Sequence, residues 1–248
     1  NKGVILSEDG ERFLGHARQV LEQVDLIEGI YKDDVVSKPH FAVSCQHYSF
    51  AVNAFVDVIR EFDAYQYDFT IREEQTHEII EDVTNLKSEL GVIYLSSKNT
   101  EVLSKMLKRN ELEFTELFTA TPHVFICDSH PLASKKNITM DDLQDYPYLT
   151  YEQGEYNSQY FSEEFVSTLD SRKNIRVRDR ATLFNLIIGL NGYTVCSGVI
   201  SAELNGRNII SKPLDVEEYM RIGIISRKGV VLSRYAREYI EALKAHCM

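Results

Sequence analysis

The chain has no long uninterrupted apolar segment. Its 248 residues are 44% hydrophobic and 26% charged, which is typical of a soluble globular protein. No stretch approaches the ~20 apolar residues that a membrane-spanning helix requires, and the first residues lack the apolar centre of a secretory signal peptide. We therefore expect a cytoplasmic protein that does not bind membranes. It is long enough for two modest domains or one large one.

Basic residues are scarce as well. Lysine and arginine together number 27 against 38 aspartates and glutamates, which gives a formal net charge of −11. Binding to a phosphate backbone requires clustered lysine and arginine, so this chain by itself is not expected to bind DNA. The acidity alone is explained by solubility. The chain also begins without methionine, and we expect a fragment whose upstream part is missing.

The sequence is poor in the motifs of catalysis and metal binding. No G-x-S-x-G, H-E-x-x-H, P-loop or Rossmann glycine motif is present. The cysteines show no CxxC or Cys/His ligand spacing, so reduced thiols are expected. We therefore expect no enzyme, no metal and no cofactor. The cysteines are Cys45, Cys127, Cys196 and Cys247.

Two kinds of charged cluster need an interpretation. The paired carboxylates Asp141-Asp142 and Glu163-Glu164 fall in segments typical of a loop or an exposed helix, and we interpret both pairs as solvated. A basic cluster alternates along a strand-like pattern, which is typical of a solvated sheet edge; a partner surface is the alternative. The cluster consists of Arg172, Lys173, Arg176, Arg178 and Arg180.

An apolar seam marks the first part of the chain. Its side chains are separated by steps of 4, 3, 4, 3 and 4 residues, which is the heptad spacing of a coiled coil. Ser7 is a suitable cap for a helix that ends near Tyr31. Because such a seam needs a partner helix, we predict a dimerisation helix. The seam residues are Phe13, Ala17, Val20, Val24, Ile27 and Tyr31.

Strand-like and helix-like segments alternate from His40 onward, which predicts βαβ units, a mainly parallel sheet and an α/β fold with two subdomains, each with its own sheet. The first set has strands near 41–43, 67–71 and 90–95 and helices near 48–62 and 76–86. The second set has strands near 124–127, 148–151, 175–177, 193–196 and 222–225 and helices near 160–169, 181–190 and 233–245.

Several short segments follow one another in an order and spacing found in a known family. Residues 3–10 and 16–21 are similar to a junction between a DNA-binding wing and a linker helix, and residues 130–133 read His-Pro-Leu-Ala. The other matching segments are 138–143, 146–147 and 189–193. Together they resemble the LysR-type transcriptional regulators over nearly the whole chain. The family often has proline where this chain has Ser197, which adds a hydroxyl group at that point.

The resemblance implies an effector-binding domain of the periplasmic-binding-protein-like type 2 fold, preceded by a long linker helix. Two crossing strands would join its two lobes. Residues 1–36 would form a wing remnant and the linker helix, 40–118 with 215–248 lobe I, and 119–214 lobe II. The winged helix-turn-helix that binds DNA is expected to be missing from the N-terminal side, which explains the few basic residues. Homodimers or homotetramers are also expected.

The lobe arrangement implies where an effector would bind. In such folds the ligand lies at the carboxyl ends of the strands, facing helix N-termini. The hydroxyl and amide groups expected there suit a small polar metabolite whose carboxylate would lie at a helix N-terminus. The resemblance gives Gln46 the position of a small hydroxyl residue. The predicted effector-binding residues are Ser44, Gln46, His47, Thr76, Ser96, Thr121, Glu152, Cys196 and Ser197.

Alternatives are open for individual residues and for the whole chain. Ser44 or Ser49 can simply cap a helix, His47 can be an ordinary loop residue, and Cys45 or Cys196 can act in redox sensing. The main alternative function is the solute-binding protein of a transporter, which shares the two-lobed fold. An enzyme on the same fold is a further alternative, because fold does not determine function.

Overall fold

A five-stranded mixed sheet forms the centre of the larger unit. The computed structural model describes residues 39–62, 66–156, 158–165, 171–200 and 205–247, and in the N-terminal stretch residues 7, 9–10, 13–17, 20–21 and 24. β1 pairs in parallel with β2 and β3, whereas β10 is antiparallel to both β3 and β4. The order across the sheet is β2 (Asp68–Glu73), β1 (His40–Cys45), β3 (Leu90–Leu95), β10 (Met220–Arg227) and β4 (Leu112–Ala120).

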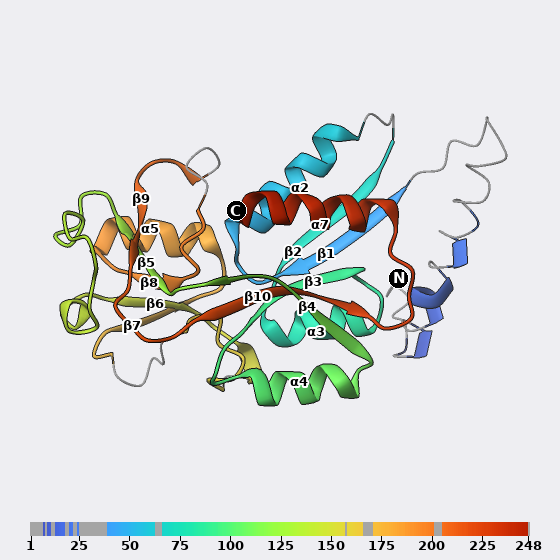
Figure 1. Cartoon of the computed structure of the whole chain (residues 1–248), viewed down its shortest axis with the longest axis horizontal. Helices are drawn as coiled ribbons and strands as arrows, with labels where there is room; N and C mark the ends of the chain where they lie inside the picture. Colours follow the sequence, from blue (N-terminus) through green and yellow to red (C-terminus); the bar gives the residue numbers. More distant parts are fainter. Residues whose placement is uncertain are drawn as a thin grey trace, which may run out of the picture.

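Helices cover both faces of this large sheet. α2 (Ser49–Glu61) and α7 (Arg234–Cys247) pack against each other on one face, and α3 (Thr76–Thr84) and α4 (Thr100–Arg109) cover the other face (Figure 1). Each face has its own cluster of buried apolar side chains. A sheet buried on both faces explains why β3, Leu90–Leu95, is an uninterrupted apolar run.

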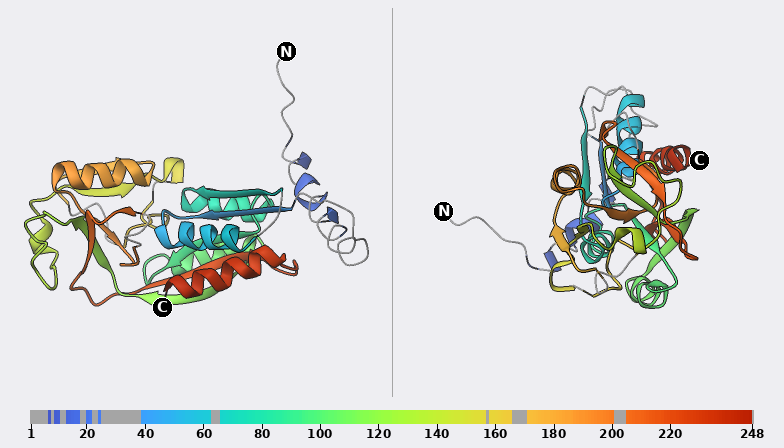
Figure 2. Two further views of the ribbon diagram at one scale, coloured as in Figure 1. Left: turned by 90° about the horizontal axis from the view of Figure 1, so that it is seen from above. Right: turned by 90° about the vertical axis from the view of Figure 1, so that its left-hand side faces the viewer.

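A smaller unit lies at the other end of the long axis of the molecule (Figures 1 and 2). Its helix α5 (Arg180–Leu190) packs against β5, β6 and β7. Strands β5, β8 and β9 pair antiparallel, and β6 and β7 pair in parallel. The chain crosses between the units after β4 and again before β10. The strands are β5 (His123–Cys127), β6 (Tyr148–Tyr151), β7 (Asn174–Val177), β8 (Thr194–Cys196) and β9 (Ile209–Pro213).

Local chemistry sets both ends of α5. The Asp179 side chain accepts a hydrogen bond from the Thr182 amide at 2.8 Å, which caps the helix N-terminus. At the other end Asn191 adopts a left-handed conformation with φ of 49°. The next residue is glycine, Gly192, because a Cβ atom at this position would lie 2.3 Å from the Leu149 Cδ1 atom. The expected helix at 181–190 and its Asn-Gly end are therefore confirmed.

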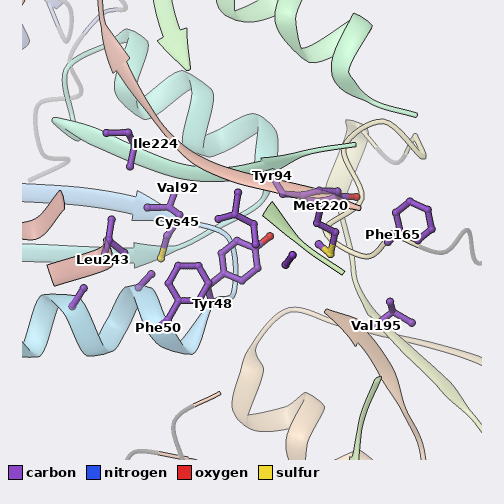
Figure 3. Packing of buried hydrophobic residues seen from close by; sticks show 14 of the residues in the cluster. Cys45, Tyr48, Phe50, Val92, Tyr94, Phe165, Val195, Met220, Ile224 and Leu243 are labelled. Atoms are coloured by element: carbon purple, nitrogen blue, oxygen red, sulfur yellow. The ribbon is translucent and has the colours of Figure 1, made fainter. Parts of the chain in front are cut away.

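One buried cluster continues from the larger unit into the smaller one. Tyr48 and Tyr94 come from the large sheet and its α2 side, whereas Phe165 and Val195 come from the small unit (Figure 3). Met220, which is fully buried, belongs to the same cluster. The two units therefore bury apolar surface against each other, which favours their close association.

The α/β class is confirmed, but three expectations were wrong or incomplete. The sheets are not mainly parallel, because β10, β4 and the β5–β8–β9 sheet are antiparallel. α4, β4 and β9 were not expected. The expected helix at 160–169 is wrong over 160–165, which forms turns and bends; there the Ser162 hydroxyl bonds to Glu164 and competes with helical hydrogen bonding. Residues 166–169 lie outside the described residues.

The described residues of the expected dimerisation helix are helical. Ser7 caps this segment, since its Oγ atom accepts a hydrogen bond from the Gly10 amide at 3.2 Å. The seam residues Phe13, Val20 and Val24 expose 70%, 63% and 43% of their surface, so no part of the chain that the structure describes covers the seam at these residues. Ala17 is half-buried. Ile27 and Tyr31 lie outside the described residues.

Candidate functional site

A small cavity lies where the two units meet. Its volume is about 30 Å³, which is room for about two water molecules. The larger unit contributes the start of α2, and the smaller unit contributes the ends of β6 and β8 and the face of α5. The polar residues that line it include His47, Ser49, Glu163, Glu164, Arg180 and Ser197.

Gln46 and Thr76 link the larger unit's helix N-termini to the smaller unit. The Gln46 Nε2 atom donates to the Thr76 Oγ1 atom at 2.6 Å, and the Gln46 Oε1 atom accepts from the Tyr94 amide at 3.0 Å. The Thr76 hydroxyl in turn donates to the Phe161 carbonyl at 2.8 Å, and its amide donates to the Gln153 side chain at 3.1 Å. Both residues are buried, so these hydrogen bonds hold Phe161 and Gln153 against the larger unit.

The contacts of His47 favour its positively charged form. Its Nδ1 atom lies 2.8 Å from a Glu163 carboxylate oxygen, and its Nε2 atom lies 3.1 Å from the Arg178 carbonyl. A carboxylate and a carbonyl oxygen only accept, so both contacts are hydrogen bonds when both ring nitrogens carry a proton. Burial alone would lower the pKa of His47, but the charge and hydrogen bond of Glu163 raise it above its ordinary value. The ring also stacks on Tyr151, with centroids 3.8 Å apart.

Glu163 and Glu164 are both buried, and the expectation that this pair is solvated was wrong. Their residues are 6% and 3% exposed. Glu163 accepts from the His47 amide at 2.9 Å and from the Gln153 Nε2 atom at 3.1 Å. Glu164 accepts from the Tyr151 amide at 2.7 Å. Burial and then the neighbouring Glu163 charge raise the pKa of Glu164 to about 8, so this carboxyl group is largely protonated at neutral pH.

A further ion pair joins the two units beside the cavity. The Arg180 guanidinium lies 3.0 Å from a Glu73 carboxylate oxygen, and these side chains are 18% and 25% exposed. The expected solvated sheet edge is therefore wrong for Arg180, whereas Arg178 is exposed. Burial raises the pKa of Glu73, although the nearby Arg180 charge opposes that shift.

The structure does not bring all predicted effector residues to this place. The Ser44 hydroxyl bonds to Asp82 at 2.8 Å, on the α3 side of the sheet. Ser96 accepts from the Lys98 amide at the start of α4, and Thr121 is exposed. None of these three lines the cavity, whereas His47, Cys196 and Ser197 do. Gln46 adjoins it, because its Oε1 atom accepts from the hydroxyl of Tyr48, which lines the cavity. Thr76 is connected to it through its hydrogen bond with Gln46.

The capping alternatives were also wrong. The N-cap of α2 is Tyr48, and no side chain caps it, so neither Ser44 nor Ser49 has that role. The N-cap of α3 is Gln75, not Thr76; its side chain and that of Glu78 form a capping box. The Thr76 hydroxyl therefore does not cap α3, and it bonds to the smaller unit instead.

Glu152 lies in a separate acidic groove next to the cavity. It pairs with Arg178, and the groove has a volume of about 420 Å³. Its lining carries six carboxylates against one arginine and two histidines: Glu73, Glu74, Glu78, Glu81, Glu152, Glu155, Arg178, His47 and His77. The Glu152 side chain is 32% exposed, and it faces this groove rather than the small cavity.

The cysteines and acidic clusters show no reactive or metal-binding arrangement. Burial raises the pKa of Cys45 and of Cys196 above the ordinary value, which opposes formation of the thiolate that redox sensing requires. Among the residues that the structure describes, no group of three His, Cys, Asp or Glu side chains is placed to hold a metal ion. In the same part of the chain no helix is long and apolar enough to cross a membrane.

Gln153, Glu163 and Glu164 are the site residues that the sequence analysis missed. The only local signal was the pair of aromatic residues, Phe161 and Phe165, that flanks the two glutamates. Phe165 is 6% exposed. Aromatic residues on both sides of a charged pair indicate that the segment can enter the interior, where large apolar side chains stabilise it.

Comparisons with known proteins agree with this fold. The chain is 24% identical over 185 residues to the malolactic fermentation system transcriptional activator of Lactococcus lactis, covering 66% of this chain but only 62% of that relative. A full-length OxyR variant from Pseudomonas aeruginosa superposes with a TM-score of 0.59 at 17% identity, covering 98% of this chain and 81% of OxyR. HinK, a LysR family regulator from the same organism, gives 0.54 at 18% identity, covering 97% and 80%.

Residues 43–248 match the family described as the LysR substrate binding domain. That span includes both units, the cavity between them and the two places where the chain crosses from one unit to the other. The fold is accordingly the two-lobed, periplasmic-binding-protein-like type 2 fold. The chain belongs to the LysR substrate-binding domain family.

Proposed function

We propose that this chain is the effector-sensing part of a LysR-type transcriptional regulator and binds a small polar metabolite between its two units. We take lobe I as residues 40–118 with 215–248 and lobe II as 119–214. Regulators of this family bind small-molecule effectors and DNA and assemble into oligomers. The relative from Lactococcus lactis is named as a transcriptional activator, which supports the same general role here.

The observation that carries this proposal is that residues of both units line the same buried cavity, which contains charged side chains. The start of α2 contributes His47, and the smaller unit contributes Tyr151, Cys196 and Ser197 to the same cavity. A ligand that contacts both units binds one relative orientation better than another and so shifts the equilibrium between them. This is the physical requirement for a sensor in a two-lobed fold.

We propose that the N-terminal seam pairs with a second copy of the chain, giving a homodimer or homotetramer. The exposure of Phe13, Val20 and Val24 supports this, because an apolar heptad seam is stable only against a partner. DNA would be bound by a winged helix-turn-helix on the N-terminal side of this chain. Such a regulator acts in the cytoplasm and without catalysis.

The test is ligand-dependent stabilisation of the chain. A ligand that binds only the native state raises its stability by mass action, so the unfolding midpoint should rise selectively with one class in a panel of amino acids, sulfur metabolites and organic acids. Calorimetric titration of the same compounds should give matching affinities. If the folded, dimeric chain binds no member of a broad panel, the sensing role is wrong.

The alternative of a transporter's solute-binding protein has less support. The named relatives, one by sequence and others by structure, are regulators. The described seam residues also have a helical, outward-facing arrangement that a monomeric binding protein does not need. An enzyme has less support as well, because the named relatives are regulators and because Glu163 and His47, the charged pair of the cavity, bond to each other.

A further inference from the structure

The cleft between the units is filled by the chain's own residues 161–165, which belong to the smaller unit. The Phe161 carbonyl accepts from the Thr76 hydroxyl at 2.8 Å. At the other end of the segment, the Lys98 Nζ atom lies 4.7 Å from the centre of the Phe165 ring. Both partners belong to the larger unit. The segment therefore contacts the larger unit at the start of α3 and in the turn before α4.

Glu163 lies in the middle of this segment, and its carboxylate is held as a bound anion would be. It accepts from the His47 backbone amide at 2.9 Å and from the His47 ring at 2.8 Å. The Gln153 Nε2 atom donates to it from the smaller unit at 3.1 Å. The Glu163 side chain is 5% exposed and the His47 side chain 4%. The Glu163 carboxylate thus bonds to the ring and the backbone amide of His47, just before α2 in the larger unit, and to the Gln153 side-chain amide in its own, smaller unit.

The free space beside Glu163 is too small for a metabolite. The cavity of about 30 Å³ holds about two water molecules, whereas small-molecule sites usually measure about 300 Å³ or more. A ligand that enters this cavity, rather than the acidic groove beside it, must therefore replace protein atoms. The side chains of Glu163 and Glu164 line the cavity and come from a segment of turns and bends. They can leave without breaking a helix or a strand pairing.

We propose that Glu163 is a built-in carboxylate ligand of the cleft, and that the effector is a small carboxylic acid anion that displaces Glu163 from His47 and Gln153. This inference rests on the proposed sensing function and names the ligand class and the competitor for that site. Displacement releases residues 161–165 from the larger unit, so effector binding changes how the two units are held together. Because the carboxylate of Glu163 competes for the same place, the apparent affinity of the chain for the free effector is also lower.

Acetate tests this competition without knowledge of the natural effector. The Glu163→Ala substitution removes a CH2–COO⁻ group, which acetate matches in size and charge. We expect acetate to bind the E163A chain at least about tenfold more tightly than the unmodified chain in calorimetric titration, and to raise the E163A unfolding midpoint. Acetamide has the same shape without the charge and should do neither. The exposed Glu155→Ala substitution is the matched control and should leave acetate binding unchanged.

A second variant keeps the test valid if E163A does not fold. Glu163→Gln retains the side-chain shape and an acceptor for His47 but not the charge, and it should bind acetate at least about threefold more tightly than the unmodified chain. Equal acetate affinity in all chains, or equal binding of acetate and acetamide, would overturn the inference. The metabolite panel on the unmodified chain tests the sensing function separately. If a panel compound binds with the same affinity to the unmodified chain and to both Glu163 variants, the sensing function is supported and the role of Glu163 is refuted.

Discussion

Replacing Glu164 by glutamine should stabilise the protein at neutral pH and lose that advantage in acid. The residue is 3% exposed. Burial first, and then the charge of Glu163, raise its pKa from 4.5 to about 8, although hydrogen bonds from Tyr151 and Ser162 oppose the shift. Between these two values the folded state holds a proton that the unfolded state releases. The unmodified protein therefore loses stability as the pH rises through this window.

The structure sets the size of the effect. One unit of pKa difference corresponds to about 1.4 kcal/mol, so the stability lost between about pH 5 and about pH 7.5 amounts to about 3 kcal/mol for this group. Glutamine does not ionise. It can still accept from the Tyr151 amide and donate to the Ser162 hydroxyl, which now bond to Glu164 at 2.7 and 3.0 Å. The free energy of unfolding of E164Q minus that of the unmodified chain should grow by about 3 kcal/mol over this range.

Urea unfolding followed by circular dichroism at the two pH values measures this difference. The raised pKa values of His47 and of Glu74, the latter about 7, change stability in the same direction, but they are present in both proteins and cancel to first order in the comparison. The exposed Glu155→Gln substitution is the control and should give a difference that does not change with pH. A difference for E164Q that is the same at both pH values would refute the assignment of a raised pKa to Glu164.

Three further substitutions test the packing of the units and the seam. Arg180→Gln should cost about 2 kcal/mol in urea unfolding, because it leaves the half-buried Glu73 without its cation. Arg178→Gln, at an 80% exposed side chain, should cost clearly less because solvent screens its ion pair, and equal losses would contradict this reasoning. Gly192→Ala should destabilise the protein by about 1–3 kcal/mol, because the new Cβ atom would lie 2.3 Å from the Leu149 side chain. At Gly189 a Cβ atom would meet nothing within 4 Å, so Gly189→Ala is the control and should be neutral or slightly stabilising. Thermal unfolding of the two variants measures the difference. Val20→Asp should reduce dimer formation in sedimentation velocity, since it places a charge in the seam; an unchanged sedimentation profile would exclude the seam as the interface.

Much of the fold was predictable because its signals are local. The apolar run of β3 indicated a buried strand, and the helix expected at 181–190 corresponds to α5, which ends at Asn191. β4 was missed because four of its nine residues are exposed and the exposed positions follow no regular alternation along Leu112–Ala120. The antiparallel direction of β10 was also missed, since periodicity within a strand does not report the direction of its neighbours.

The sequence by itself determined most of the helices and strands, the α/β class and the heptad seam, because burial period and caps act over a few residues. Only the tertiary structure decided which polar groups meet in the cleft. Glu163 and His47 are 116 residues apart, and no local pattern shows that a pair of glutamates is buried against a histidine on another unit. Their burial depends on the charge, hydrogen bonds and apolar neighbours that distant segments supply after folding.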